Sequence, residues 1–97
     1  MHTKPSLSDE NRPARDRVLD AVKQIVGEQV GLAPEGIREQ DRLVADLACD
    51  SLDVVEIQME VEEHFDLTVP DEVDQATLTV GDIADGVLQL LGQDSGN

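Results

Sequence analysis

Residues 51–65, SLDVVEIQMEVEEHF, carry the helical pattern that decides the fold of this 97-residue chain. At about 100° per residue, one arc of such a helix collects four apolar side chains. They are those of Val54, Ile57, Val61 and Phe65. Because an amphipathic helix buries its apolar face, the stretch predicts a helix that packs into a core through these four residues.

A second apolar stripe of the same helix lies well away from the core face and consists of Leu52, Val55 and Met59. Acids border it, with Glu62 on one side and Glu56, Glu63, Glu60 and Asp53 on the other. This arrangement resembles the apolar core and charged rim of a protein interface. Its like-charge pairs at i,i+3 and i,i+4 destabilise a helix by roughly 0.2–0.5 kcal/mol each, so stability alone does not select it. We expect a docking face; the alternative is a solvated outer face on which Asp53 complements the helix dipole.

Two further helices follow from the same periodicity. From about Arg15 to Val30, bracketed by Pro13 and Gly31, one arc holds Val18, Leu19, Val22, Ile25, Val26 and Val30. Thr79 can cap a last helix over about 80–91, whose apolar face holds Val80, Ile83, Ala84, Val87 and Leu91. A short helix is expected over residues 71–76, because Pro70 and two acids suit a helix start.

A loop of about twenty residues, Gly31 to Asp50, separates the first two main helices. Loops of this length are uncommon unless they are functional or packed down, and four apolar anchors indicate packing: Leu32, Ile37, Leu43 and Leu47. Residues 1–12 and 92–97 are polar and read as disordered tails around a domain over residues 13–91. With no alternating run long enough for a strand, the chain is predicted to be all-α: a small bundle of three main helices and one short helix.

The formal net charge of −15 is concentrated in one half of the chain. Residues 43–97 carry fourteen acids and no lysine or arginine. A field of this sign repels nucleic acid and anionic membranes and attracts proteins with basic surfaces. No stretch approaches the roughly 20 apolar residues of a membrane span, and no secretory signal is recognisable. We therefore expect a soluble, monomeric cytoplasmic protein whose partners are basic proteins.

Ser51 is the candidate chemical centre of the chain. It stands at a helix start, where unpaired backbone N–H groups and the helix dipole can hold an anion such as a phosphate. A serine hydroxyl needs a base before it attacks anything, and no histidine or lysine is near in sequence. The two histidines, His2 and His64, do not form a cluster that would bind a metal. The small set of reactive side chains in this sequence favours a carrying or binding protein over an enzyme.

The sequence around Ser51 resembles the attachment site of acyl carrier proteins. The resemblance rests on Asp50-Ser51-Leu52, preceded by Leu43-Val-Ala-Asp-Leu47 and followed by Asp53-Val-Val-Glu-Ile57. The later runs EEHFDLTVPD (residues 62–71) and LTV (residues 78–80) resemble the helix end, the proline turn and the last helix start of that family. Together these runs extend over roughly residues 15–91, in the family's order.

The resemblance implies that a phosphopantetheinyl transferase attaches 4′-phosphopantetheine from coenzyme A to Ser51, and that the arm's thiol carries acyl groups as thioesters. It implies no catalytic activity of the chain itself. Its further partners would be ketosynthases, acyltransferases and other acyl-processing enzymes of fatty-acid or polyketide synthesis. By analogy, the docking residues are Asp50, Leu52, Asp53, Val55, Glu56, Met59, Glu62 and Glu63.

Several departures and alternatives remain open at this point. Ala48 and Cys49 stand where the family usually has Gly-Ala, and Gln58 and Glu60 replace an apolar and a small residue. Cys49 is either a small packed residue or a reactive thiol that captures acyl groups from the neighbouring arm or forms an intermolecular disulfide. The chain could also serve a dedicated aminoacyl or peptidyl pathway, or be a non-carrying interaction module in which Ser51 only caps a helix.

Overall fold

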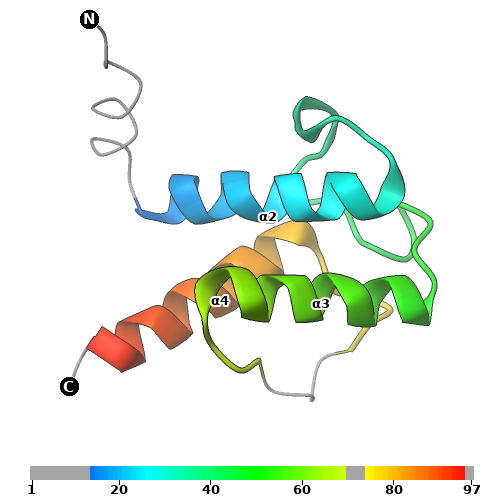
Figure 1. Cartoon of the computed structure of the whole chain (residues 1–97). Helices are drawn as coiled ribbons and strands as arrows, with labels where there is room; N and C mark the ends of the chain where they lie inside the picture. Colours follow the sequence, from blue (N-terminus) through cyan, green and yellow to red (C-terminus); the bar gives the residue numbers. More distant parts are fainter. Residues whose placement is uncertain (1–13, 70–73, 96–97) are drawn as a thin grey trace, which may run out of the picture.

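The computed structural model describes residues 14–69 and 74–95, and this part of the chain is all-helical. It contains α2 (Ala14–Val30), the single-turn 3-10 helix η1 (Pro34–Gly36), α3 (Ser51–Phe65) and α4 (Val80–Ser95). Helix α2 packs against both α3 and α4, and α2 and α3 run in opposite directions (Figure 1). The expected small helical bundle is confirmed.

Helix α2 buries the predicted face, including Val18, Val22 and Val26. Two glycines, Gly27 and Gly31, form the turn that ends the helix. Gly31 adopts a left-handed φ of 80°, and the backbone N–H groups of Gly31 and Leu32 both donate to the carbonyl oxygen of Gly27 (2.8 and 3.0 Å). This pattern satisfies a carbonyl that the helix end would leave unpaired. A Cβ on Gly27 would collide with the Leu32 carbonyl oxygen, so the turn requires glycine there.

Helix α3 has the predicted bounds and the predicted core face. Val54, Ile57 and Val61 are fully buried, and Phe65 packs against the core while partly exposed. The helix ends at Asp66, which has a left-handed φ of 55° and donates its backbone N–H to the Glu62 carbonyl. These contacts fix α3 as one wall of the core.

Helix α4 begins with the predicted Thr79 cap. The Asp82 backbone N–H donates to Thr79 Oγ1 (3.0 Å), and the Thr79 N–H donates to Asp82 Oδ2 (3.1 Å). This reciprocal pair is a capping box. Val80, Ala84 and Val87 are buried, as expected, and the helix runs to Ser95, beyond the predicted end at Leu91.

The long loop between α2 and α3 is packed down, although one of its four predicted anchors is wrong. Ile37 and Leu43 are buried and Leu47 is partly buried, but Leu32 is 47% exposed. Leu32 belongs to the turn that closes α2, and the Cδ1 atom of Ile37 lies close to Gly27 instead. Ile37, and not Leu32, therefore packs against the end of α2.

Backbone hydrogen bonds join the loop to the start of α4. The N–H groups of Leu43, Val80 and Gly81 donate to the carbonyls of Leu78, Asp41 and Glu39, respectively, at 2.8 to 3.0 Å. Arg15 adds ion pairs from α2 to Asp85 and Glu39, both at 2.7 Å, and these pairs, that with Asp85 first, raise the pKa of its guanidinium. The loop is thus held at both helices before it enters α3.

The predicted short helix over residues 71–76 lies partly outside the described residues, and Gln75–Thr77 form a turn. In the described part of the chain, regular strand pairing is limited to one isolated bridge, between Arg42 and Thr79. Over the same residues, no helix has both the length and the apolar character needed to cross a membrane.

Candidate functional site

Ser51 is the first residue of α3, and its side chain is exposed. The N-cap is Asp50: its Oδ1 accepts from the Asp53 N–H (2.8 Å), while the Asp50 N–H donates to Asp53 Oδ2 (3.2 Å). Within residues 14–69 and 74–95, the Ser51 hydroxyl makes no hydrogen bond. The alternative in which Ser51 caps the helix is therefore wrong, and the hydroxyl is free for other chemistry.

The backbone around Ser51 suits an anion. The first N–H groups of a helix lack partners within it, and the capping box uses that of Asp53 while those of Ser51 and Leu52 precede it. These donors lie at the positive end of the helix dipole, which favours a negative group on the serine. His64 lies thirteen residues further along α3, roughly 20 Å away at 1.5 Å per residue, so it is no base for this hydroxyl.

The second apolar stripe of α3 is exposed, as predicted. Leu52 is 62% exposed, Val55 41% and Met59 54%, although all three are large apolar side chains. Glu56 and Glu63 border the stripe as exposed acids. A hollow of about 250 Å³ opens beside Met59 and is lined by Gln29, Glu56, Met59, Glu60 and Glu63. We call Leu52, Val55 and Met59, together with the bordering acids Asp53, Glu56, Glu60, Glu62 and Glu63, the acid-framed strip.

Glu62, on the other border of the strip, is only partly exposed. Its Oε2 accepts a hydrogen bond from the Val69 N–H (2.9 Å), which ties the segment after α3 back to the helix. Glu62 therefore has a structural role as well as a predicted docking role, as Asp50 and Asp53 do through the capping box of α3.

Gln29 is a site residue that the pattern of the sequence did not bring forward. Its Nε2 donates to Asp53 Oδ1 (3.0 Å) and to Glu56 Oε1 (2.7 Å), so it joins α2 to two acids of the strip. Hydrogen bonds from Gln29, and then from the Asp50 backbone, lower the pKa of Asp53. A signal exists in the sequence: Gln29 lies two helical turns after Val22 and hence within the apolar arc of its helix.

Cys49 is buried, 4% exposed, and its backbone N–H donates to the Leu43 carbonyl (2.9 Å). Burial, and then the charges of Asp53 and Asp50, raise the pKa of its thiol. Because the thiolate is the reactive form, these surroundings favour the packed interpretation over acyl capture. The preceding Ala48 has a left-handed φ of 61°, a conformation in which glycine is more stable than alanine.

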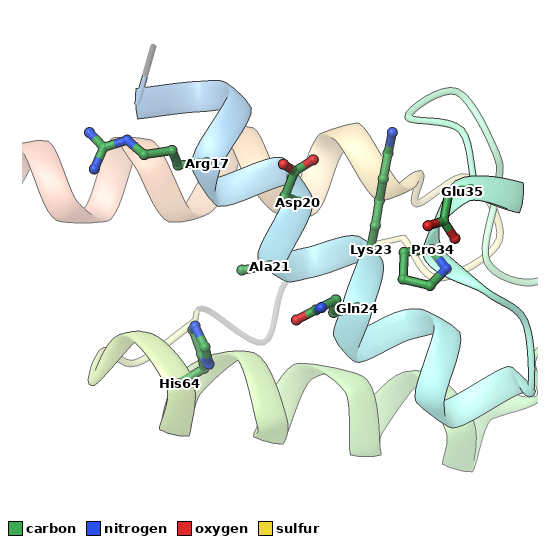
Figure 2. A pocket seen from close by; sticks show the side chains of 8 residues that line it. All are labelled: Arg17, Asp20, Ala21, Lys23, Gln24, Pro34, Glu35 and His64. Atoms are coloured by element: carbon green, nitrogen blue, oxygen red, sulfur yellow. The ribbon is translucent and has the colours of Figure 1, made fainter. Parts of the chain in front are cut away.

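A recess of about 630 Å³ lies elsewhere, between α2, η1 and the C-terminal end of α3 (Figure 2). Arg17 and Lys23 extend in different directions in Figure 2, and Asp20 and Glu35 offset their charge. From α3 the recess takes only His64, whose ring packs edge-on against Phe65 (centroids 4.7 Å apart). Ser51 does not line this recess, and its side chains of mixed charge do not indicate one kind of ligand. Among the described residues, no group of three or more His, Cys, Asp and Glu side chains could hold a metal ion.

Comparison with known proteins assigns the chain to a family. The phosphopantetheine attachment site family matches residues 20–87. The chain is similar to an acyl carrier protein of Sulfurovum sp. (strain NBC37-1), with 46% identity over 65 residues, 67% of this chain and 87% of that protein. It is also similar to those of Wolinella succinogenes (44% over 66 residues; 68% and 87%) and Bdellovibrio bacteriovorus (44% over 63 residues; 65% and 81%). These matches agree with the helical bundle and with the exposed serine at the start of α3. The chain therefore belongs to the acyl carrier protein family, and its covalent cofactor is 4′-phosphopantetheine.

Proposed function

We propose that Ser51 carries the 4′-phosphopantetheine arm and that the chain shuttles acyl groups between enzymes of fatty-acid or polyketide synthesis without catalysing a reaction itself. The observation that carries this proposal is the exposed Ser51 hydroxyl, which the Asp50–Asp53 capping box leaves without a hydrogen bond in the described residues. When attached, the arm supplies a terminal thiol that holds acyl groups as thioesters.

The attachment reaction assigns a simple part to this chain. The Ser51 oxygen attacks a phosphorus of the coenzyme A pyrophosphate, the bridging P–O bond breaks, and adenosine 3′,5′-bisphosphate leaves. The proton of the hydroxyl goes to a base of the transferase, because His64 is too far along α3 to accept it. The N–H groups of the first turn and the helix dipole stabilise the negative phosphodiester on Ser51.

The acid-framed strip is the proposed docking face for the phosphopantetheinyl transferase, ketosynthases and acyltransferases. It begins beside Ser51, so an enzyme bound there faces the modified serine. Its exposed apolar centre, Leu52, Val55 and Met59, fits the dry centre of an interface. Four of its acids, Asp53, Glu56, Glu62 and Glu63, complement basic partners and steer their approach, together with the neighbouring Asp50.

The acidity of α3 favours a fatty-acid or polyketide carrier over an aminoacyl or peptidyl carrier. The chain carries no lysine or arginine after residue 42, which favours partners with basic surfaces in the same way. We place the protein in the cytoplasm as a monomer. The non-carrying alternative loses its main support, because Asp50 rather than Ser51 caps α3.

Intact mass after co-expression with a broad-specificity phosphopantetheinyl transferase tests the proposal. We expect a gain of one phosphopantetheine in the wild type and in Ser95→Ala, and none in Ser51→Ala. Ser95 is a matched control because it is a serine at the far end of α4. A wild type that stays at the apo mass beside a fully modified control carrier refutes the carrier function. Modification of Ser51→Ala refutes the assignment of the serine.

A further inference from the structure

One side chain of α2 reaches across to the docking face of α3. The amide nitrogen of Gln29 lies 3.0 Å from Asp53 Oδ1 and 2.7 Å from Glu56 Oε1. An amide NH₂ group has two hydrogens, so each carboxylate receives one of them. Gln29 thereby uses both donors on two acids that lie one helical turn apart.

Asp53 and Glu56 are like charges at i,i+3, and such a pair repels within a helix. Hydrogen bonds from a shared donor offset this repulsion and fix the two carboxylates. A lysine at position 29 would also offset the repulsion between the two carboxylates, but its positive charge would neutralise one of their negative charges. The neutral amide of Gln29 holds the acids in place and leaves their full charge available to a basic partner.

The contact also reaches the attachment site. While Oδ1 of Asp53 accepts from Gln29, its Oδ2 accepts from the Asp50 N–H (3.2 Å). Asp50 immediately precedes Ser51. The amide of Gln29 is thus linked through Asp53 to the backbone that presents the serine.

Gln29 further lines the hollow of about 250 Å³ beside Met59, together with Glu56, Glu60 and Glu63. Gln29 comes from α2 and the other lining residues come from α3. A partner side chain that enters the hollow therefore meets both helices, so the docking face extends beyond α3.

We infer that Gln29 is a positioning residue of the docking face: it orients the carboxylates of Asp53 and Glu56 for the basic surface of the phosphopantetheinyl transferase. This inference rests on the proposed function. Without Gln29, the Glu56 carboxylate would be ordered only when the partner binds, and Asp53 would keep only its hydrogen bond from the Asp50 N–H. Ordering a flexible side chain at an interface weakens binding by roughly two- to tenfold.

The test is the steady-state kinetics of phosphopantetheine transfer to Gln29→Met, which keeps the length of the side chain and removes both donors. We expect KM for the carrier to rise about two- to tenfold per released carboxylate while kcat stays unchanged, because docking weakens and the chemistry at Ser51 does not. Gln24→Met is the matched control, since Gln24 is an exposed glutamine of the same helix and lies away from the strip. Its KM should equal that of the wild type.

A variant cycle separates positioning from a general loss of structure. In an Asp53→Ala/Glu56→Ala background, the additional Gln29→Met change should leave KM unaltered, because both acceptor groups that Gln29 orients are gone. An equal rise of KM in both backgrounds overturns the inference, as does an unchanged KM in Gln29→Met alone. The NMR titration of Asp53 supplies a second readout: its pKa should rise in Gln29→Met and stay in Gln24→Met. Since the wild type must first be modified for KM to exist, failure of the proposed function is recognised separately.

Discussion

Asp50 and Asp53 exchange hydrogen bonds on either side of Ser51: the carboxylate of each residue accepts the backbone N–H of the other. The first turn of α3 is thereby fixed without the hydroxyl of the serine between them. This arrangement separates the stability of the helix start from the chemistry of Ser51.

Removing the cap should destabilise the protein. We expect Asp50→Ala to lower the free energy of unfolding by about 0.5–2 kcal/mol, because the Asp53 N–H loses its acceptor. Urea unfolding followed by circular dichroism measures this loss. Asp50→Ser, which restores a capping oxygen without the charge, should recover most of the stability. Equal losses in both variants would contradict the role of the cap.

The left-handed backbone of Ala48 should make glycine the more stable residue at this position. A left-handed conformation costs an L-residue with a Cβ about 1–2 kcal/mol, so we expect Ala48→Gly to stabilise the fold by about 1 kcal/mol. Thermal unfolding of the variant measures the gain. Ala45→Gly is the control: Ala45 lies in the same loop with an ordinary negative φ, and its substitution should bring no stabilisation.

Charge reversal on the acid-framed strip should weaken transferase binding. We expect Glu56→Lys or Glu63→Lys to reduce the affinity about three- to tenfold at low salt and less at high salt, where ions screen the attraction. Glu35→Lys makes the same charge change on η1 and should have a small effect. The measurement is binding to the transferase at two ionic strengths. Equal affinities of all three variants at low salt would refute electrostatic docking.

Cys49 should react slowly in the native protein. Burial and the neighbouring acids raise the pKa of its thiol, so the reactive thiolate becomes populated only at a higher pH than in an ordinary cysteine. We expect alkylation by iodoacetamide at neutral pH to be slow in buffer and to accelerate in urea. Rapid alkylation of the native protein would contradict this prediction and support the hypothesis that this thiol captures acyl groups.

The helices could be predicted from the sequence because their information is local. The 3.6-residue period fixed which face of α3 is buried, and the same period found the exposed strip of Leu52, Val55 and Met59. Thr79 was recognisable as a cap because this threonine directly precedes an apolar periodic run.

The long loop was harder to predict, since its anchors follow no period. Leu32 and Ile37 are equally apolar, and only the path of the turn after Gly31 decides which of them covers the end of α2. The alanine at position 48 does not itself indicate a left-handed φ, and the one sign is the glycine that the acyl carrier proteins usually have there.

The sequence by itself determined the helical faces, the charge of the second half and the position of a serine at a helix start, because these depend on residue type and local spacing. Only the tertiary structure decided that Asp50, and not Ser51, caps α3, since both residue types are good caps and the choice depends on backbone geometry. It also decided that Gln29 holds Asp53 and Glu56, because a contact across 24 and 27 residues of sequence exists only once α2 and α3 have packed.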